Sequence, residues 1–229
     1  MKISRILKYL FISFLFLMPL NINGQNSEEW FPSQGLTLGV NLAGPFTSII
    51  NNERNGFSFL TRISAKNEFN LYGELGFENV NFEKTEYHYN SNGSFFKLGL
   101  EKNILKTAEA GRIDNLLVGA FYGFAVQQHG ASRIFVPNGY WDNHTGRMGA
   151  YAMSSHWFEI SGGPRMELFK NFFVGWSMHL RILIYRNNSN IMDPYLIPGY
   201  GNGGNIVNAS FSYNIEYMIP WKKAKRIDN

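Results

Sequence analysis

The sequence predicts an all-β fold, an eight-stranded antiparallel up-and-down transmembrane β-barrel with a polar, plugged lumen. Three observations predict it. Apolar and polar residues alternate through eight segments, the connections between these segments alternate between short and long, and no window after the N-terminal segment shows a clean helical period with caps. Such alternation is typical of strands, because successive side chains of a strand point to opposite faces. The 20 Phe, 12 Tyr and 23 Gly residues also favour β-structure with many turns.

The stretch FFVGWSMHLRILIY, residues 172–185, shows the alternation most clearly. Its even positions are all apolar and include Trp176 and Ile182, whereas its odd positions include Ser177, His179 and Arg181. A strand here has one apolar face and one face that carries hydroxyl, imidazole and guanidinium groups. The two faces therefore meet different surroundings.

Seven further segments follow the same rule. The last of them is the most regular, with seven apolar odd positions out of seven and five polar even positions out of six. Pro164 lies on an apolar face and lacks the N–H that a ladder needs, so we expect a bulge or bend there. In chain order the seven segments are 36–42, 57–64, 69–78, 96–101, 116–127, 156–168 and 207–219.

The connections predict the order of the strands. Three are short or moderate and four are longer and rich in Asn, Gly, Tyr and Pro. Strict alternation of the two kinds is typical of hairpins in an up-and-down meander. The short connections are 65–68, 102–113 and 169–171, and the long ones are 44–56, 81–94, 128–151 and 187–204.

Residues 1–24 read as a secretory signal peptide. Lys2, Arg5 and Lys8 precede an apolar run of signal-peptide length, which is shorter than the roughly 20 residues of a membrane-spanning helix. We expect the barrel to occupy 25–221 and a basic periplasmic tail to occupy 222–229. Removing the signal lowers the formal charge from +4 to +1, so the composition gives no reason to expect a nucleic-acid partner. The absence of cysteine excludes an acylated N-terminal cysteine and disulfides.

Three arguments predict that the apolar face points outward to lipid. Bulky aromatics lie on the apolar face while glycines gather on the polar face, where a crowded lumen would need them. Seven successive apolar positions match an apolar band about 25 Å tall. Charges of both signs on the polar face offer each other partners. The alternative is a soluble periplasmic, lipocalin-like barrel that carries apolar ligands and displays these charges to water.

We predict that the charged and polar side chains facing the lumen form a hydrogen-bonded network with a structural role. Eight strands leave no water channel when so many charged side chains fill the interior, so we expect no conducting pore. The predicted members are Arg62, Glu74, Glu78, Lys97, Glu101, Glu159, Arg165, Glu167, His179, Arg181 and Glu216.

The C-terminal part of the chain resembles a known family. The Arg of LRILI, the loop IPGYG and the closing aromatic strand SFSYNIEYMIPW, together with the hairpin layout, are similar to an uncharacterised family of outer-membrane β-barrel proteins from Bacteroidota, named only as a domain of unknown function (DUF6048-like). This resemblance implies a fold and an outer-membrane location. It implies no activity.

Catalysis and metal binding have little support in the pattern. Ser177 and His179 lie on one face of a strand, and Glu216 on the next strand could orient the imidazole, which would suit a lipid-modifying barrel enzyme. A serine in mid-lumen is hard for an acyl chain to reach, so we expect no catalytic residue. The other histidines are scattered without ligand spacing, and we expect no metal or other cofactor.

The long connections carry the candidate contact residues. With a periplasmic N-terminus and eight strands, all four face the cell exterior, where aromatic side chains can bind ligands or partners or can rest in the aromatic girdle of the bilayer. We expect outer-membrane lipid and the barrel-assembly machinery as partners, with an extracellular ligand or protein as a further one. The candidate loop contacts are Phe135, Tyr140, Trp141, Tyr195 and Tyr200.

Overall fold

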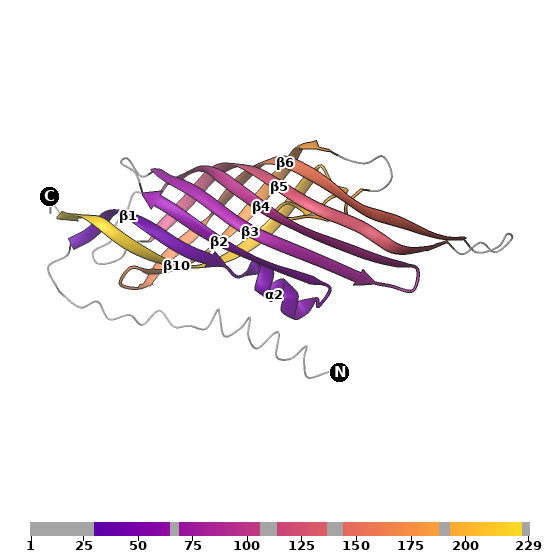
Figure 1. Cartoon of the computed structure of the whole chain (residues 1–229). Coiled ribbons are helices and arrows are strands. Elements are labelled where there is room, and N and C mark those ends of the chain that lie inside the picture. Colours follow the sequence, from indigo (N-terminus) through magenta and orange to yellow (C-terminus); the bar gives the residue numbers. More distant parts are fainter. Residues whose placement is uncertain (1–29, 65–68, 106–113, 137–143, 188–192, 226–229) are drawn as a thin grey trace.

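The chain folds into a closed antiparallel barrel of eight long strands. A computed structural model describes residues 30–64, 69–105, 114–136, 144–187 and 193–225 (Figure 1). The ring runs β1-β10-β7-β6-β5-β4-β3-β2, so neighbours in sequence are neighbours in space and the first long strand closes on the last. The barrel strands are β1 (Trp30–Asn41), β2 (Arg54–Ser64), β3 (Phe69–Glu83), β4 (Tyr87–Asn103), β5 (Asn115–Val136), β6 (His144–Phe169), β7 (Phe172–Arg186) and β10 (Val207–Lys225). The predicted all-β, eight-stranded up-and-down barrel is confirmed.

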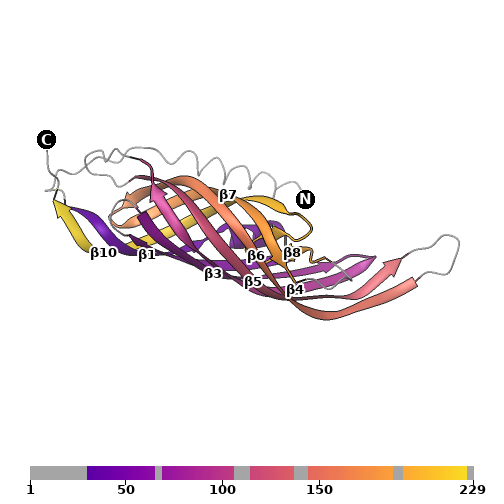
Figure 2. The same ribbon diagram turned by 90° about the horizontal axis from the view of Figure 1, so that it is seen from above.

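Two of the predicted loops are mostly strand. β3 and β4 pair as far as Glu83↔His88, and β5 and β6 pair as far as Val136↔His144, so the segments 81–94 and 128–151 are hairpins that extend the barrel wall. Figures 1 and 2 show them projecting beyond the rest of the ring. We call this the hairpin end, and the end that holds the first residues of β1 and the last of β10 the terminal end. These hairpins are rich in polar residues and lack a continuous apolar face, so the alternation used to predict strands did not detect them.

The expectation of no helix was wrong at one place. α2 (Ala43–Ile50) follows β1 in the connection 44–56, and the Asn41 side chain accepts a hydrogen bond from the Ala43 N–H at 2.9 Å. Eight residues are too few to show a helical period in sequence. Among the described residues, no helix is both long and apolar enough to cross a bilayer.

The bend predicted at Pro164 lies within a continuous β6. Gly162 pairs with Met178 and Arg165 with Gly175 on β7, but neither Gly163 nor Pro164 has a partner on that side.

The β10 ladder continues to Lys225, which lies opposite Trp30, and so includes the first residues of the segment predicted as a basic tail. The signal prediction falls outside the described residues.

The two faces of the barrel differ as the alternation predicts. On β7, Trp176 is 46% exposed and Ile182 is 44% exposed, whereas His179 is buried. The same division holds on β10, where Phe211, Tyr213 and Ile215 alternate with buried polar residues. A barrel of this size is filled by side chains, so its interior is the core and its apolar surface is the outside.

A short segment between β7 and β10 folds back into the hairpin end. It includes the two-residue strands β8 (Leu196–Ile197) and β9 (Gly201–Asn202), which pair with each other. We call residues 193–206 the plug segment.

Candidate functional site

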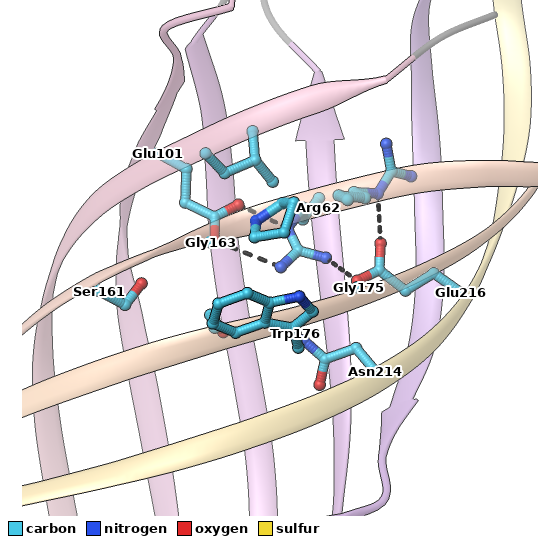
Figure 3. A pocket seen from close by; sticks show the side chains of 12 residues that line it. Arg62, Glu101, Ser161, Gly163, Gly175, Trp176, Asn214 and Glu216 are labelled. Atoms are coloured by element: carbon cyan, nitrogen blue, oxygen red, sulfur yellow. Dashed lines mark hydrogen bonds and ion pairs between the residues drawn. The ribbon is translucent and has the colours of Figure 1, made fainter. Parts of the chain in front are cut away.

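The interior near the terminal end holds a four-residue ionic cluster. Arg62 lies between Glu101 and Glu216, as Figure 3 shows, with its Nε 2.5 Å from a Glu101 oxygen and its Nη1 bonded to Glu216. Arg165 donates from Nε to the other Glu216 oxygen at 2.6 Å, and its guanidinium stacks on the Phe173 ring at 3.5 Å. These four charged residues, from β2, β4, β6 and β10, form the terminal cluster.

A second cluster lies further toward the hairpin end. Lys97 bonds to Glu74 at 2.6 Å and to Glu159 at 3.4 Å, and Arg181 donates to Glu159 at 2.7 Å. His179 places Nδ1 2.7 Å from Glu159 Oε1, the oxygen that Lys97 also contacts, whereas Arg181 donates to Oε2. These five residues form the hairpin cluster. Beyond it, Arg54 pairs with Glu78 at the rim.

The ion pairs balance charge within each group. The terminal cluster has two arginines and two glutamates, and the hairpin cluster has Lys97 and Arg181 against Glu74 and Glu159, with His179 as the remaining member. A buried charge is tolerated when it is paired and hydrogen-bonded, and both glutamates of the hairpin cluster meet that condition. The two clusters are therefore electroneutral when His179 is neutral.

Two of the sequence expectations for these residues differ from the structure. Glu167 lies outside both clusters and accepts a hydrogen bond from the Asn171 N–H at 2.7 Å, in the turn between β6 and β7. The carboxylate that orients His179 is Glu159 on β6, whereas Glu216 belongs to the terminal cluster. Both β6 and β10, the neighbours of β7, carry glutamates on the inner face. Alternation predicts which face a side chain lies on but not how far along the barrel axis it lies, so it could not tell which glutamate contacts His179.

Two serines complete the surroundings of His179. Its Nε2 lies 2.9 Å from Ser177 Oγ and 2.9 Å from Ser212 Oγ, and the two hydroxyl oxygens are 2.8 Å apart. Ser212 comes from β10, directly opposite Ser177 in the ladder. Sequence reasoning named Ser177 and missed Ser212, although the β10 pattern places its side chain on the same inner face.

The interior also contains aromatic side chains that depend on glycine. A methyl group on Gly123 would overlap the Trp157 indole, and one on Gly119 would overlap the Phe121 ring. Trp157 and Phe121 are fully or almost fully buried. The inner-face glycines thus make room for aromatic rings inside the barrel, where the sequence argument had expected bulky aromatics only on the outer, apolar face.

The plug segment closes the hairpin end of the interior. Ile197 and Tyr200 are completely buried, and Tyr200 packs on Trp157 with ring centroids 5.7 Å apart. Gln127 donates to the Leu196 carbonyl at 3.0 Å, and Arg181 donates to the Tyr200 carbonyl at 3.1 Å. The plug is thus bonded to the barrel wall and to the hairpin cluster.

The predicted loop contacts lie in different places. Tyr200 is completely buried, so the prediction that it is an exposed contact residue was wrong. Its hydroxyl donates to the Ile206 carbonyl at 2.6 Å, and burial raises the pKa of this hydroxyl. Tyr195 is half exposed and packs edge-on against Phe82. Phe135 is half-buried near the tip of β5. Tyr140 and Trp141 lie outside the described residues.

His129 lies beyond the apolar part of β5, near the plug. It is 1% exposed, and neither ring nitrogen has a hydrogen-bond partner among the described residues. Burial lowers the pKa of His129, the Arg186 charge lowers it further, and Asp193 opposes both. Below its pKa the imidazolium would be buried without a hydrogen-bond acceptor.

Two cavities in the described interior lie beside these clusters. One of about 20 Å³ lies beside Arg62 and Glu216 of the terminal cluster (Figure 3), and Ser177 also lines it. The other, of about 180 Å³, extends from α2 and the plug glycines Gly199 and Gly201 to Lys97, Arg181 and Ser212. No group of three or more His, Cys, Asp or Glu side chains in the described part of the chain is arranged to hold a metal ion.

Comparison with known proteins identifies the family. The model of the domain of unknown function DUF6048 matches residues 6–224. The chain belongs to this family. No curated protein matches it. Among solved structures, Ail, the attachment invasion locus protein of Yersinia pestis, matches at 9% identity and a TM-score of 0.40 over 81% of this chain and 96% of that one. The same protein in complex with the heparin analogue sucrose octasulfate matches over the same shares at 9% identity and a TM-score of 0.37.

Proposed function

We propose that this DUF6048 protein is an integral outer-membrane β-barrel that binds an extracellular ligand or partner at its hairpin end and conducts no ions. The observation that carries the proposal is the two-sided wall, apolar outside and ionic inside. A barrel in water would place these surfaces the other way round, because apolar area gains about 25 cal/mol per Å² when it leaves water.

The outer apolar band has the height that a bilayer requires. On β7 the outward positions from Phe172 to Ile184 are all apolar, and at about 3.3 Å per residue they run roughly 40 Å along the strand. With a tilt of about 40°, this corresponds to roughly 30 Å along the barrel axis, close to the apolar band of outer-membrane barrels.

The interior supports a closed barrel instead of a channel. Two ionic clusters, the buried Trp157 and the plug segment fill it, and the larger cavity is about 180 Å³. The surface left for partners is the hairpin end, where β5 and β6 project beyond the apolar band. The barrel-assembly machinery and outer-membrane lipid are the other partners this architecture needs.

The first test is a fractionation combined with a heat-shift gel. We expect the protein in the outer-membrane fraction, with a faster-moving band when the detergent extract is left unboiled. Recovery in the soluble periplasmic fraction would refute the proposal and make a soluble carrier the better interpretation.

A charge scan of the outer face tests the lipid contact directly. Leu180→Arg places a cation in the middle of the apolar band and should lower the unfolding free energy in lipid vesicles by about 2–4 kcal/mol. The matched control is Gln128→Arg, at an exposed position beyond the band, which should change it by less than about 0.5 kcal/mol. Equal effects of the two substitutions would contradict lipid contact at Leu180.

A further inference from the structure

We propose that Ser212, His179 and Glu159 form a nucleophilic site at the base of the 180 Å³ cavity, which hydrolyses small esters that carry an anionic group. This activity goes beyond the binding function proposed above. It depends on the folded barrel interior and not on the lipid around it.

The charge balance of the hairpin cluster orients the imidazole. Glu159 is ionised between Lys97 and Arg181 and accepts a hydrogen bond from His179 Nδ1, 2.7 Å away. A second proton on His179 would leave the cluster with an uncompensated positive charge in a buried setting, which is costly. The neutral ring, held with Nδ1–H toward the carboxylate, leaves the Nε2 lone pair facing the serine hydroxyls. This is the arrangement of base and orienting acid that activates a serine nucleophile.

The surroundings distinguish Ser212 from Ser177. Each oxygen lies 2.9 Å from His179 Nε2, which accepts only one proton at a time. Ser212 lines the larger cavity, whereas Ser177 lines the cavity of about 20 Å³, which has room for about one water molecule. Ser212 therefore donates to the imidazole and meets the ligand. Ser177, 2.8 Å from Ser212 Oγ, donates to it and stabilises negative charge on that oxygen.

The cavity limits the substrate by size and charge. A cavity of about 150 Å³ holds a benzene molecule, so 180 Å³ accommodates a ligand of about one ring or a short acyl chain. The charged side chains that line this cavity are Arg54, Lys97 and Arg181 on one side and Glu74 and Glu78 on the other, so the cations outnumber the carboxylates by one. This excess of positive charge favours an anionic group of the substrate and the oxyanion that forms on attack.

The reaction needs only water as a co-reactant. Ser212 Oγ attacks the ester carbonyl carbon while its proton passes to His179 Nε2. The tetrahedral intermediate then collapses, the C–O bond to the alcohol breaks, and the alcohol leaves with that proton. A water molecule attacks the acyl-serine in the same manner, releasing the acid and restoring the serine hydroxyl.

The test uses the full chain folded in detergent, with each sample first checked for the heat shift. Diisopropyl fluorophosphate is the covalent probe, and 4-acetoxybenzoate, a one-ring acetate ester that carries a carboxylate, is the substrate. Mass spectrometry should place the probe on Ser212, and Ser212→Ala should abolish both labelling and turnover. His179→Gln should lower the labelling rate about 100-fold or more, as loss of a general base does. Ser210→Ala is the matched control, since Ser210 lines the same cavity but lacks a hydrogen bond to His179 among the described residues.

The outcomes separate this proposal from the barrel itself. Unlabelled wild-type protein that shows the heat shift would overturn the site and leave the barrel standing. Labelling that survives Ser212→Ala, or that Ser210→Ala removes equally, would also overturn it. Absence of any heat shift, with the protein soluble, would instead refute the outer-membrane proposal.

Discussion

Removing Arg62 from the terminal cluster should destabilise the barrel strongly. Its guanidinium bonds to Glu101 and Glu216 at once, and its side chain is only 7% exposed. After Arg62→Met, Glu216 keeps Arg165 at 2.6 Å, but Glu101 has no second ion-pair partner in the described structure. An uncompensated buried charge of this kind costs about 3–5 kcal/mol of unfolding free energy.

A double substitution distinguishes the loss of a partner from the loss of packing. Arg62→Met with Glu101→Leu removes both charges and leaves Arg165 and Glu216 as a matched pair. Replacing both members of a buried pair by apolar side chains of similar volume is often close to neutral, so we expect the double variant within about 1 kcal/mol of wild type. The rim pair gives the control: Arg54 is 34% exposed, and Arg54→Met should cost less than about 1 kcal/mol.

The assay is urea unfolding in lipid vesicles, followed by tryptophan fluorescence and by the heat shift. A loss of less than about 0.5 kcal/mol for Arg62→Met would refute the view that paired charges hold the interior together. A double variant that is less stable than the single one would show that the arginine acts through packing alone.

Three further changes test the hairpin cluster, the plug and the buried His129. Arg181→Ala should reduce resistance to heat, because it removes a partner of a buried glutamate and a bond to the plug; unchanged resistance would count against the paired interior. Gly199→Ala should expose the plug to protease, since Gly199 has φ 69° and a methyl group there would overlap the Phe95 ring; Gly204→Ala should not, and equal cleavage of both would contradict this reasoning. The pKa of His129 is lowered on folding, so the unfolded chain binds more protons and stability falls as pH drops below about 6.5. His129→Phe should flatten this part of the pH profile of urea unfolding, and an unchanged profile would place the acid sensitivity elsewhere.

Strand alternation predicted the barrel because the physics behind it is local. A residue such as Trp176 or His179 reaches one face or the other according to its position alone, so the two faces follow from the sequence with few assumptions. The extended parts of β5 and β6 lacked this signal. Beyond the apolar band both faces contact water or the plug, and no apolar stripe is needed there. The helix α2 was missed for a related reason, since a helix of two turns shows too little periodicity.

Predicting which side chains pair inside the barrel requires the strand register, which alternation does not give. Arg62 bonds to a glutamate 154 positions away because β1 and β10 close the ring. Likewise, His179 meets Glu159 because the β6 ladder places Ser161 opposite His179 and Glu159 opposite Arg181. A shift of two residues along that ladder would have kept every side chain on its face and changed every ion pair. The sequence therefore predicts which charged residues face the lumen. The register of the paired strands in the closed ring determines which glutamate contacts His179 and which serine lines the cavity. The proposed chemistry of Ser212 depends on the register, and the labelling experiment tests it at the level of a single residue.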